Sequence, residues 1–172
     1  MTSEPFSNTD AAFQQCAERI AQIDGRNLLA RRGVRVLGDG SFGDARLLTD
    51  GLAGSRGDEG RVFLNGAPTV VAFYLGQPKT VTEIGLFSFN IDTRGNQDFE
   101  VRLADNSQHP GVKPDFRNSP VFSSGDTVIG PNAGGCFTRL ADKSGGPLVP
   151  GKVDWVEFRI WRTHTVQAGE PA

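Results

Sequence analysis

Apolar and polar side chains alternate along several short segments of the chain, and this alternation predicts β-strands. In residues 98–103 the apolar side chains of Phe99, Val101 and Leu103 are separated by charged ones. A period of two places the two kinds of side chain on opposite faces of an extended segment, as in a strand with one buried face. Residues 98–103 therefore predict a half-buried strand.

Similar runs, rich in β-branched and aromatic residues, recur along the chain. The predicted strands cover residues 33–37, 69–75, 81–89, 99–104 and 152–162. Glycine, proline and polar residues break the pattern at 76–78 and 92–96, and the short spacing of the three central strands predicts an antiparallel meander. Between residues 105 and 151, prolines leave only short apolar pieces at 120–122, 126–129 and 135–140.

The last predicted strand, residues 152–162, has an aromatic residue on each face. Alternation places Phe158 on the apolar face and both Trp155 and Trp161 on the opposite face. Two indoles on an outer sheet face would give the apolar stripe of an N-terminal helix a surface to pack on, since each buries roughly 150–250 Å². The alternative is a stacking platform open to solvent.

One segment, residues 9–24, has helical periodicity. Asn8 or Thr9 is a suitable N-cap, and Gly25 is a suitable stop. The apolar residues at helical spacing are Phe13, Cys16, Ala17, Ile20 and Ile23. This apolar stripe requires a partner surface. The β-domain supplies it in the simplest arrangement, and a stalk or neighbouring domain of a longer protein is the alternative.

Composition favours an all-β fold. The chain has 172 residues, 37% of them hydrophobic, with 22 glycines and 10 prolines. That length suits one domain with a full core, and so many glycines and prolines favour short strands and turns over long helices. We therefore predict an antiparallel β-sandwich of jelly-roll type at residues 27–172, preceded by an N-terminal segment with one α-helix at residues 1–26.

Charge and hydropathy exclude some classes of partner. The formal net charge is -2, so the surplus of basic residues that drives non-specific nucleic-acid binding is missing. No run approaches the ~20 apolar residues that cross a bilayer, so no transmembrane segment is predicted, and residues 1–10 lack the features of a secretion signal. Cys16 and Cys136 are too few for a disulfide framework and match no zinc spacing; they form one bridge or remain two buried thiols.

The order of several short motifs resembles the galactose-binding-domain-like superfamily. The motifs are Asn-Leu-Leu-Ala at 27–30, Leu-Thr-Asp-Gly at 48–51, Val-Ala-Phe-Tyr-Leu-Gly at 71–76, Val-Thr-Glu-Ile-Gly-Leu at 81–86 and Val-Glu-Phe-Arg-Ile at 156–160. An arginine-bearing loop precedes Phe99. The resemblance covers residues 27–162 and implies the jelly roll of discoidin and coagulation-factor C domains and of many carbohydrate-binding modules.

The resemblance also implies where a metal and a closing strand belong. In such domains the Asp of the Asp-Gly turn often ligates a structural calcium ion, and Asp50 is the matching residue, with Asp44 nearby and Glu170 as the distal acid. Calcium takes six to eight hard oxygens, which carboxylates and loop carbonyls supply. The alternative is that Asp50 caps a turn. The family's closing strand after the Arg159 run is missing; either the chain stops early or the N-terminal region occupies that edge.

Sugar binding requires a flat aromatic ring and planar hydrogen-bonding groups. Asp92, Arg94, Asn96 and Gln97 offer donors and acceptors beside a strand, and the resemblance favours this loop as the ligand site. The candidate rings are those of Phe42, Phe89 and Phe116. The same polar residues also suit a turn that is merely solvated.

No catalytic motif is present. His109 and His164 are the only histidines, and the chain has no Gly-x-Ser-x-Gly or His-Glu-x-x-His motif and no phosphate-binding glycine loop. We therefore predict a non-catalytic module that binds carbohydrate or a glycoconjugate, holds structural calcium, and belongs to a larger extracellular or cell-surface protein. The competing hypothesis is a protein-binding adhesion or structural domain without a sugar site.

Overall fold

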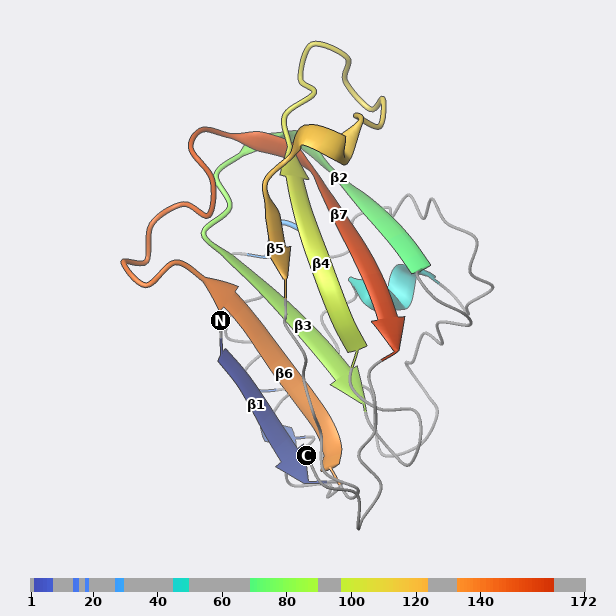
Figure 1. The fold of residues 1–172 in the computed structure, drawn as a ribbon, viewed down its shortest axis with the longest axis vertical. Helices are drawn as coiled ribbons and strands as arrows, with labels where there is room; N and C mark the ends of the chain where they lie inside the picture. The colour runs from blue at the N-terminus through green and yellow to red at the C-terminus, as the bar shows by residue number, and fades with distance from the viewer. Residues whose placement is uncertain are drawn as a thin grey trace.

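The computed structural model describes residues 2–7, 14, 15, 18, 27–29, 45–49, 69–89, 97–123 and 133–162, which are mainly antiparallel β-strands (Figure 1). The strands are β1 (Thr2–Ser7), β2 (Thr69–Lys79), β3 (Glu83–Phe89), β4 (Gln97–Ala104), β5 (Val121–Ser123), β6 (Ala133–Ala141) and β7 (Val153–Arg162). Two short 3-10 helices are η1 (Ala45–Leu48) and η3 (Phe116–Asn118). The all-β prediction is confirmed. The predicted strand at 33–37 and the apolar piece at 126–129 lie outside the described residues.

The strands form a three-stranded sheet in the order β1-β6-β3 and a four-stranded sheet in the order β2-β7-β4-β5. The predicted meander of β2, β3 and β4 is wrong, because β7 lies between β2 and β4, and β3 belongs to the other sheet. Each of these strands has one apolar face. Distributing them over two sheets lets those faces meet in one core, which a single open meander would leave half exposed.

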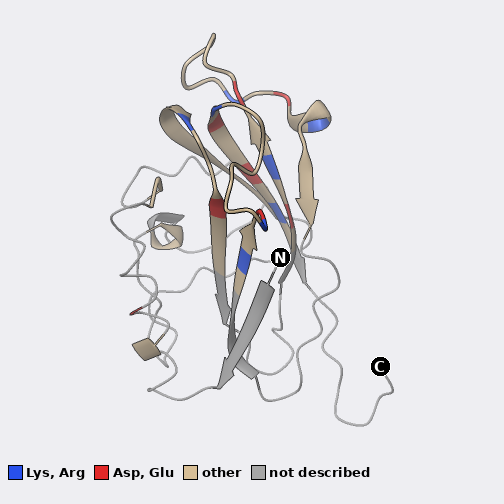
Figure 2. Ribbon diagram, turned by 90° about the vertical axis from the view of Figure 1, so that its left-hand side faces the viewer, with Lys and Arg blue, Asp and Glu red and all other residues tan. Residues whose placement is uncertain are grey.

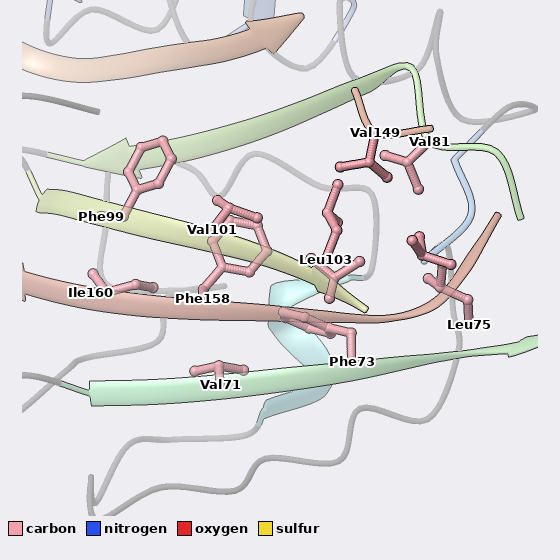
Figure 3. Packing of buried hydrophobic residues seen from close by; sticks show 12 residues of the cluster. Val71, Phe73, Leu75, Val81, Phe99, Val101, Leu103, Val149, Phe158 and Ile160 are labelled. Carbon is pink, nitrogen blue, oxygen red and sulfur yellow. The ribbon is translucent and has the colours of Figure 1, made fainter. Parts of the chain in front are cut away.

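A single hydrophobic cluster joins the apolar faces (Figure 3). It contains Phe73, Phe99, Val101 and Phe158, the inner-face residues that alternation predicts. The Phe158 ring lies edge-on to Phe73 at 5.7 Å between centroids and 6.1 Å from Phe99. Ile84 and Leu86 of β3 pack against the same cluster. The core therefore lies between the two sheets.

Strand β2 is longer than the sequence predicts. The predicted break at residues 76–78 is wrong, since β2 continues to Lys79 with a shift of register between Tyr74 and Lys79. Gly76 has a φ of 82°, which glycine adopts without a steric penalty. Pro78 has no N–H to donate and is tolerated where the ladder is interrupted. The glycine and proline at 76–78 thus mark an irregularity within β2 rather than the end of the strand.

The N-terminal region holds a strand that the sequence analysis missed. β1 pairs with β6 at one edge of the three-stranded sheet. Gln14, Gln15 and Glu18 have helical backbone, and Gln14 Nε2 donates to Glu18 Oε1 at 3.2 Å. The rest of the helix predicted at 9–24 lies outside the described residues, so that helix stays a prediction.

The connections between strands gather at two ends of the fold. β2, β4 and β6 finish at one end, called the Asp105 end, where residues 80–82, 105–120 and 142–152 connect the strands. The backbone N–H of Leu148 donates to the carbonyl of Val81 there, at 2.9 Å, and ties two of these connections together. β3 and β7 finish at the opposite end, called the Gln97 end, where β4 begins.

Candidate functional site

The face of the four-stranded sheet that points away from the core carries aromatic and charged side chains in regular rows. The backbone register places Trp155 of β7 between Tyr74 of β2 and Ala104 of β4. The next row along β7 holds Glu157 between Ala72 and Arg102, and the third holds Arg159 between Val70 and Glu100. We call this surface the outer face.

The β4–β5 connection, residues 105–120, folds over the first two rows. Phe116 is 4% exposed and packs with Trp155 and Ala72. Arg102 Nη1 donates to the Phe116 carbonyl at 3.1 Å, and Lys113 Nζ lies 2.9 Å from Glu157 Oε2. Hydrophobic contact, a hydrogen bond and an ion pair therefore hold this connection on the outer face.

Local chemistry forms the short helix η3 within this connection. Asp115 is its N-cap, and the Asp115 side chain accepts from the backbone N–H of Arg117 at 3.0 Å. The Arg117 guanidinium pairs with the same carboxylate, and these hydrogen bonds lower the pKa of Asp115 to about 2. The N-cap places Phe116 at the start of η3, where its ring turns toward the sheet.

The start of β7 is tied to the same connection. Asp154 is 1% exposed, and its Oδ1 accepts from the backbone N–H of Asn106 at 2.7 Å. Gly111 has a φ of 75°, and a Cβ at that position would lie 4.0 Å from Tyr74 Cε1. The Gly111 turn therefore lies against the edge of the Tyr74 ring.

Trp155 is a packing residue. It is fully buried, its ring centroid lies 5.1 Å from that of Tyr74, and its cluster includes Ala72 and Phe116. The packing interpretation of Trp155 is confirmed, although the partners that the structure describes come from the sheet and from η3 rather than from the predicted N-terminal helix. Phe116 is likewise buried, so its ring is not a free sugar platform. The side chain of Trp161 lies outside the described residues.

Several polar atoms of the outer face are buried without a hydrogen-bond partner. They are Arg102 Nε, Trp155 Nε1, Glu157 Oε1 and Arg159 Nε. Arg159 Nε and Glu157 Oε1 lie 3.5 Å apart, which makes an ion pair without hydrogen-bond geometry. Unpaired donors therefore outnumber unpaired acceptors on this surface, whereas native interiors usually satisfy both.

On the outer face, basic side chains outnumber acidic ones around Glu157. Lys113 and Arg159 both pair with this one carboxylate, whose side chain is 3% exposed, while Arg102 pairs with Glu100. Elsewhere basic and acidic positions are interspersed along the described strands (Figure 2), as in the cross-strand pair of Arg139 with Glu83 at 2.7 Å. Two half-exposed cations thus share a single buried anion.

Of the predicted sugar-binding residues, only Gln97 lies in the described part of the chain. Gln97 begins β4, where its backbone is the register partner of Arg162. Asp92, Arg94 and Asn96 lie outside the described residues, as does Phe42. β3 ends at Phe89 in one sheet and β4 begins at Gln97 in the other, both at the Gln97 end of the fold.

The predicted metal ligands and the cysteine pair are not tested by the structure. Asp44, Asp50 and Glu170 lie outside the described residues. Within the described ranges, no group of three or more His, Cys, Asp or Glu side chains could hold a metal ion. Cys136 lies in β6, opposite Ser88, and Cys16 lies outside the described part, so both cysteine alternatives stay open.

Sequence reasoning missed the ion pair that links Lys113 to Glu157. Alternation does place Glu157 and Arg159 on one face of β7, and Glu100 and Arg102 on one face of β4. Comparing these two charged pairs would have suggested neighbouring strands. Lys113 lies in an irregular connection, and no local pattern indicates where such a segment folds.

Comparison with known proteins identifies no family. No protein-family model matches the chain, and no curated protein matches its sequence. Among solved structures the chain is similar to chitosan-binding module 1 derived from a chitosanase/glucanase from Paenibacillus sp. IK-5. The sequence identity is 12%, the TM-score is 0.33, and the match covers 78% of this chain and 98% of that chain. None of the helices in the part that the structure describes is long and apolar enough to cross a membrane.

Proposed function

We propose that the protein is a non-catalytic carbohydrate-binding module of jelly-roll, galactose-binding-like type. Its ligand residues are Asp92, Arg94, Asn96 and Gln97, and it forms part of a larger extracellular or cell-surface protein. The observation that carries the proposal is that β3 ends at Phe89 in one sheet and β4 begins at Gln97 in the other, at the same end of the fold. Rigid sheets with a polar connection at their end are a common arrangement for recognition.

The chemistry of this segment fits sugar hydroxyls. Arg94, Asn96 and Gln97 supply planar donors in fixed directions, and Asp92 and the amide oxygens supply acceptors. Sites built to hydrogen-bond hydroxyl groups discriminate strongly against ligands that lack them. Neither the motifs of the sequence nor the outer face supplies a nucleophile paired with a base, which favours binding without a covalent step.

Replacing Arg94 by alanine is expected to weaken sugar binding about 10- to 100-fold, the effect of removing a charge-assisted hydrogen bond. Isothermal titration of the full chain against a panel of neutral and amino sugars measures this. Arg117→Ala is the matched control, because Arg117 lies at the Asp105 end with its side chain 86% exposed. If no sugar binds while a protein partner is captured, the module is an adhesion domain instead.

We also propose that Asp50, Asp44 and Glu170 hold a structural calcium ion. A bound ion stabilises the folded state in proportion to the logarithm of its concentration over its dissociation constant. Chelator is therefore expected to lower the melting temperature of the native chain, and Asp50→Ala is expected to remove that sensitivity. A melting temperature that chelator leaves unchanged would rule the ion out.

A further inference from the structure

We propose that the outer face of the four-stranded sheet is a second binding site, which takes a carboxylate or sulfate group of an acidic glycan on Arg159 and Lys113. This site goes beyond the proposed function, because it lies on a sheet surface and uses none of the residues of the segment that ends at Gln97.

The first argument is the state of Arg159. The Nε atom of Arg159 lies 3.5 Å from Glu157 Oε1. The Arg159 side chain is nevertheless 43% exposed. In the described part of the chain it makes no other hydrogen bond or ion pair. The ion pair with Glu157 engages only the Nε side of the guanidinium, and the planar geometry of the two terminal nitrogens matches a carboxylate or sulfate with two parallel hydrogen bonds.

The second argument is the charge imbalance at Glu157. Lys113 Nζ and Arg159 Nε lie 2.9 Å and 3.5 Å from the two oxygens of this one carboxylate. Lys113 and Arg159 are both partly exposed, whereas the Glu157 side chain is 3% exposed. Solvent therefore meets these two cations more than their shared anion, and the neighbouring Glu100, which is 29% exposed, is paired with Arg102. One external negative charge would neutralise the surplus.

The third argument is the excess of unpaired donors. Trp155 Nε1 and Glu157 Oε1 are polar atoms of side chains that are at least nine-tenths buried, and neither has a hydrogen-bond partner. Together with Arg102 Nε and Arg159 Nε, this surface has three unpaired donors and one unpaired acceptor. These buried atoms cannot touch a ligand, but their uncompensated N–H dipoles add to the positive potential around Arg159 and Lys113, which favours an anionic ligand over a cationic one.

A glycan fits this surface better than a nucleic acid. Tyr74 is half-buried on the same face, and its ring offers surface against which a sugar can stack. The chain as a whole is acidic, with a pI near 5.7, so it lacks the basic field with which nucleic-acid-binding proteins attract a polyphosphate backbone.

The experiment measures binding of the full chain to polygalacturonate, which carries carboxylates, to dextran sulfate, which carries sulfates, and to neutral dextran. We expect binding to one or both acidic polymers, weakened by salt, and no Arg159-dependent binding to dextran. Arg159→Gln is expected to weaken it about 10-fold or more, the effect of losing hydrogen bonds to a charged group. Arg117→Gln, the exposed control in the β4–β5 connection, is expected to leave it within about two-fold, since Arg117 is already paired with Asp115.

Three outcomes would overturn the site: no binding to either acidic polymer, an equal effect of Arg117→Gln and Arg159→Gln, or tighter Arg159-dependent binding to a thymidine oligonucleotide. Thermal unfolding of each variant verifies that it is folded. Arg94→Ala separates this inference from the proposed function, because that change is expected to weaken only neutral sugar binding, and Arg159→Gln only acidic polymer binding.

Discussion

Replacing Phe158 by alanine is expected to lower the free energy of unfolding by about 3–5 kcal/mol. The Phe158 side chain is 6% exposed and contacts the rings of Phe73 and Phe99 from the centre of β7. β7 itself pairs with both β2 and β4. The change therefore removes buried apolar surface and leaves a cavity in the middle of the larger sheet. Urea denaturation followed by intrinsic fluorescence measures the loss.

Two further variants separate the core contribution from general sensitivity to mutation. Phe158→Leu keeps most of the apolar volume, so its effect is expected to be clearly smaller than that of alanine. Val112→Ala truncates an apolar side chain that is 58% exposed and is expected to change stability by less than about 0.5 kcal/mol. A similar loss for Phe158→Ala and Val112→Ala would show that the cluster between the sheets is not the main core.

The inner faces of the strands could be predicted from the sequence because they follow from local periodicity. Phe99, Val101 and Phe158 lie in one core cluster as their alternation indicates. Strand order could not be predicted in the same way. β2 and β4 are close in sequence, but both pair with β7, which comes from the end of the chain. Such pairing depends on long-range register, and no short window of sequence records it.

The same distinction between local pattern and long-range packing applies to the residues of the candidate sites. Trp155 could be assigned to an outer face from alternation, but the Phe116 ring that covers it comes from a connection interrupted by prolines. The sequence places Phe116 in a predicted loop, which makes its ring a candidate sugar platform. In the structure the N-cap of η3 at Asp115 instead directs Phe116 onto the sheet. Loop residues take their positions from tertiary packing, so their chemistry is predictable before their location is.

Replacing Lys113 by methionine is expected to destabilise the protein by about 2 kcal/mol, because Glu157 then keeps a buried charge without its nearest partner. Glu157 is 2% exposed, and Lys113 Nζ lies 2.9 Å from its carboxylate. We expect less than the full loss for a buried pair, since the Lys113 side chain is 35% exposed and Arg159 remains near Glu157. Urea denaturation measures the change.

The double variant Lys113→Met/Glu157→Met tests the cause of this loss. It removes both charges while keeping apolar volume, so it is expected to be more stable than Lys113→Met alone. That order would show that the uncompensated carboxylate, and not the lost lysine stem, lowers stability. If the loss in the double variant equals the sum of the losses in Lys113→Met and Glu157→Met, the two charges are not energetically coupled. The β4–β5 connection would then be held on the outer face by Phe116 and by the hydrogen bond from Arg102 to the Phe116 carbonyl.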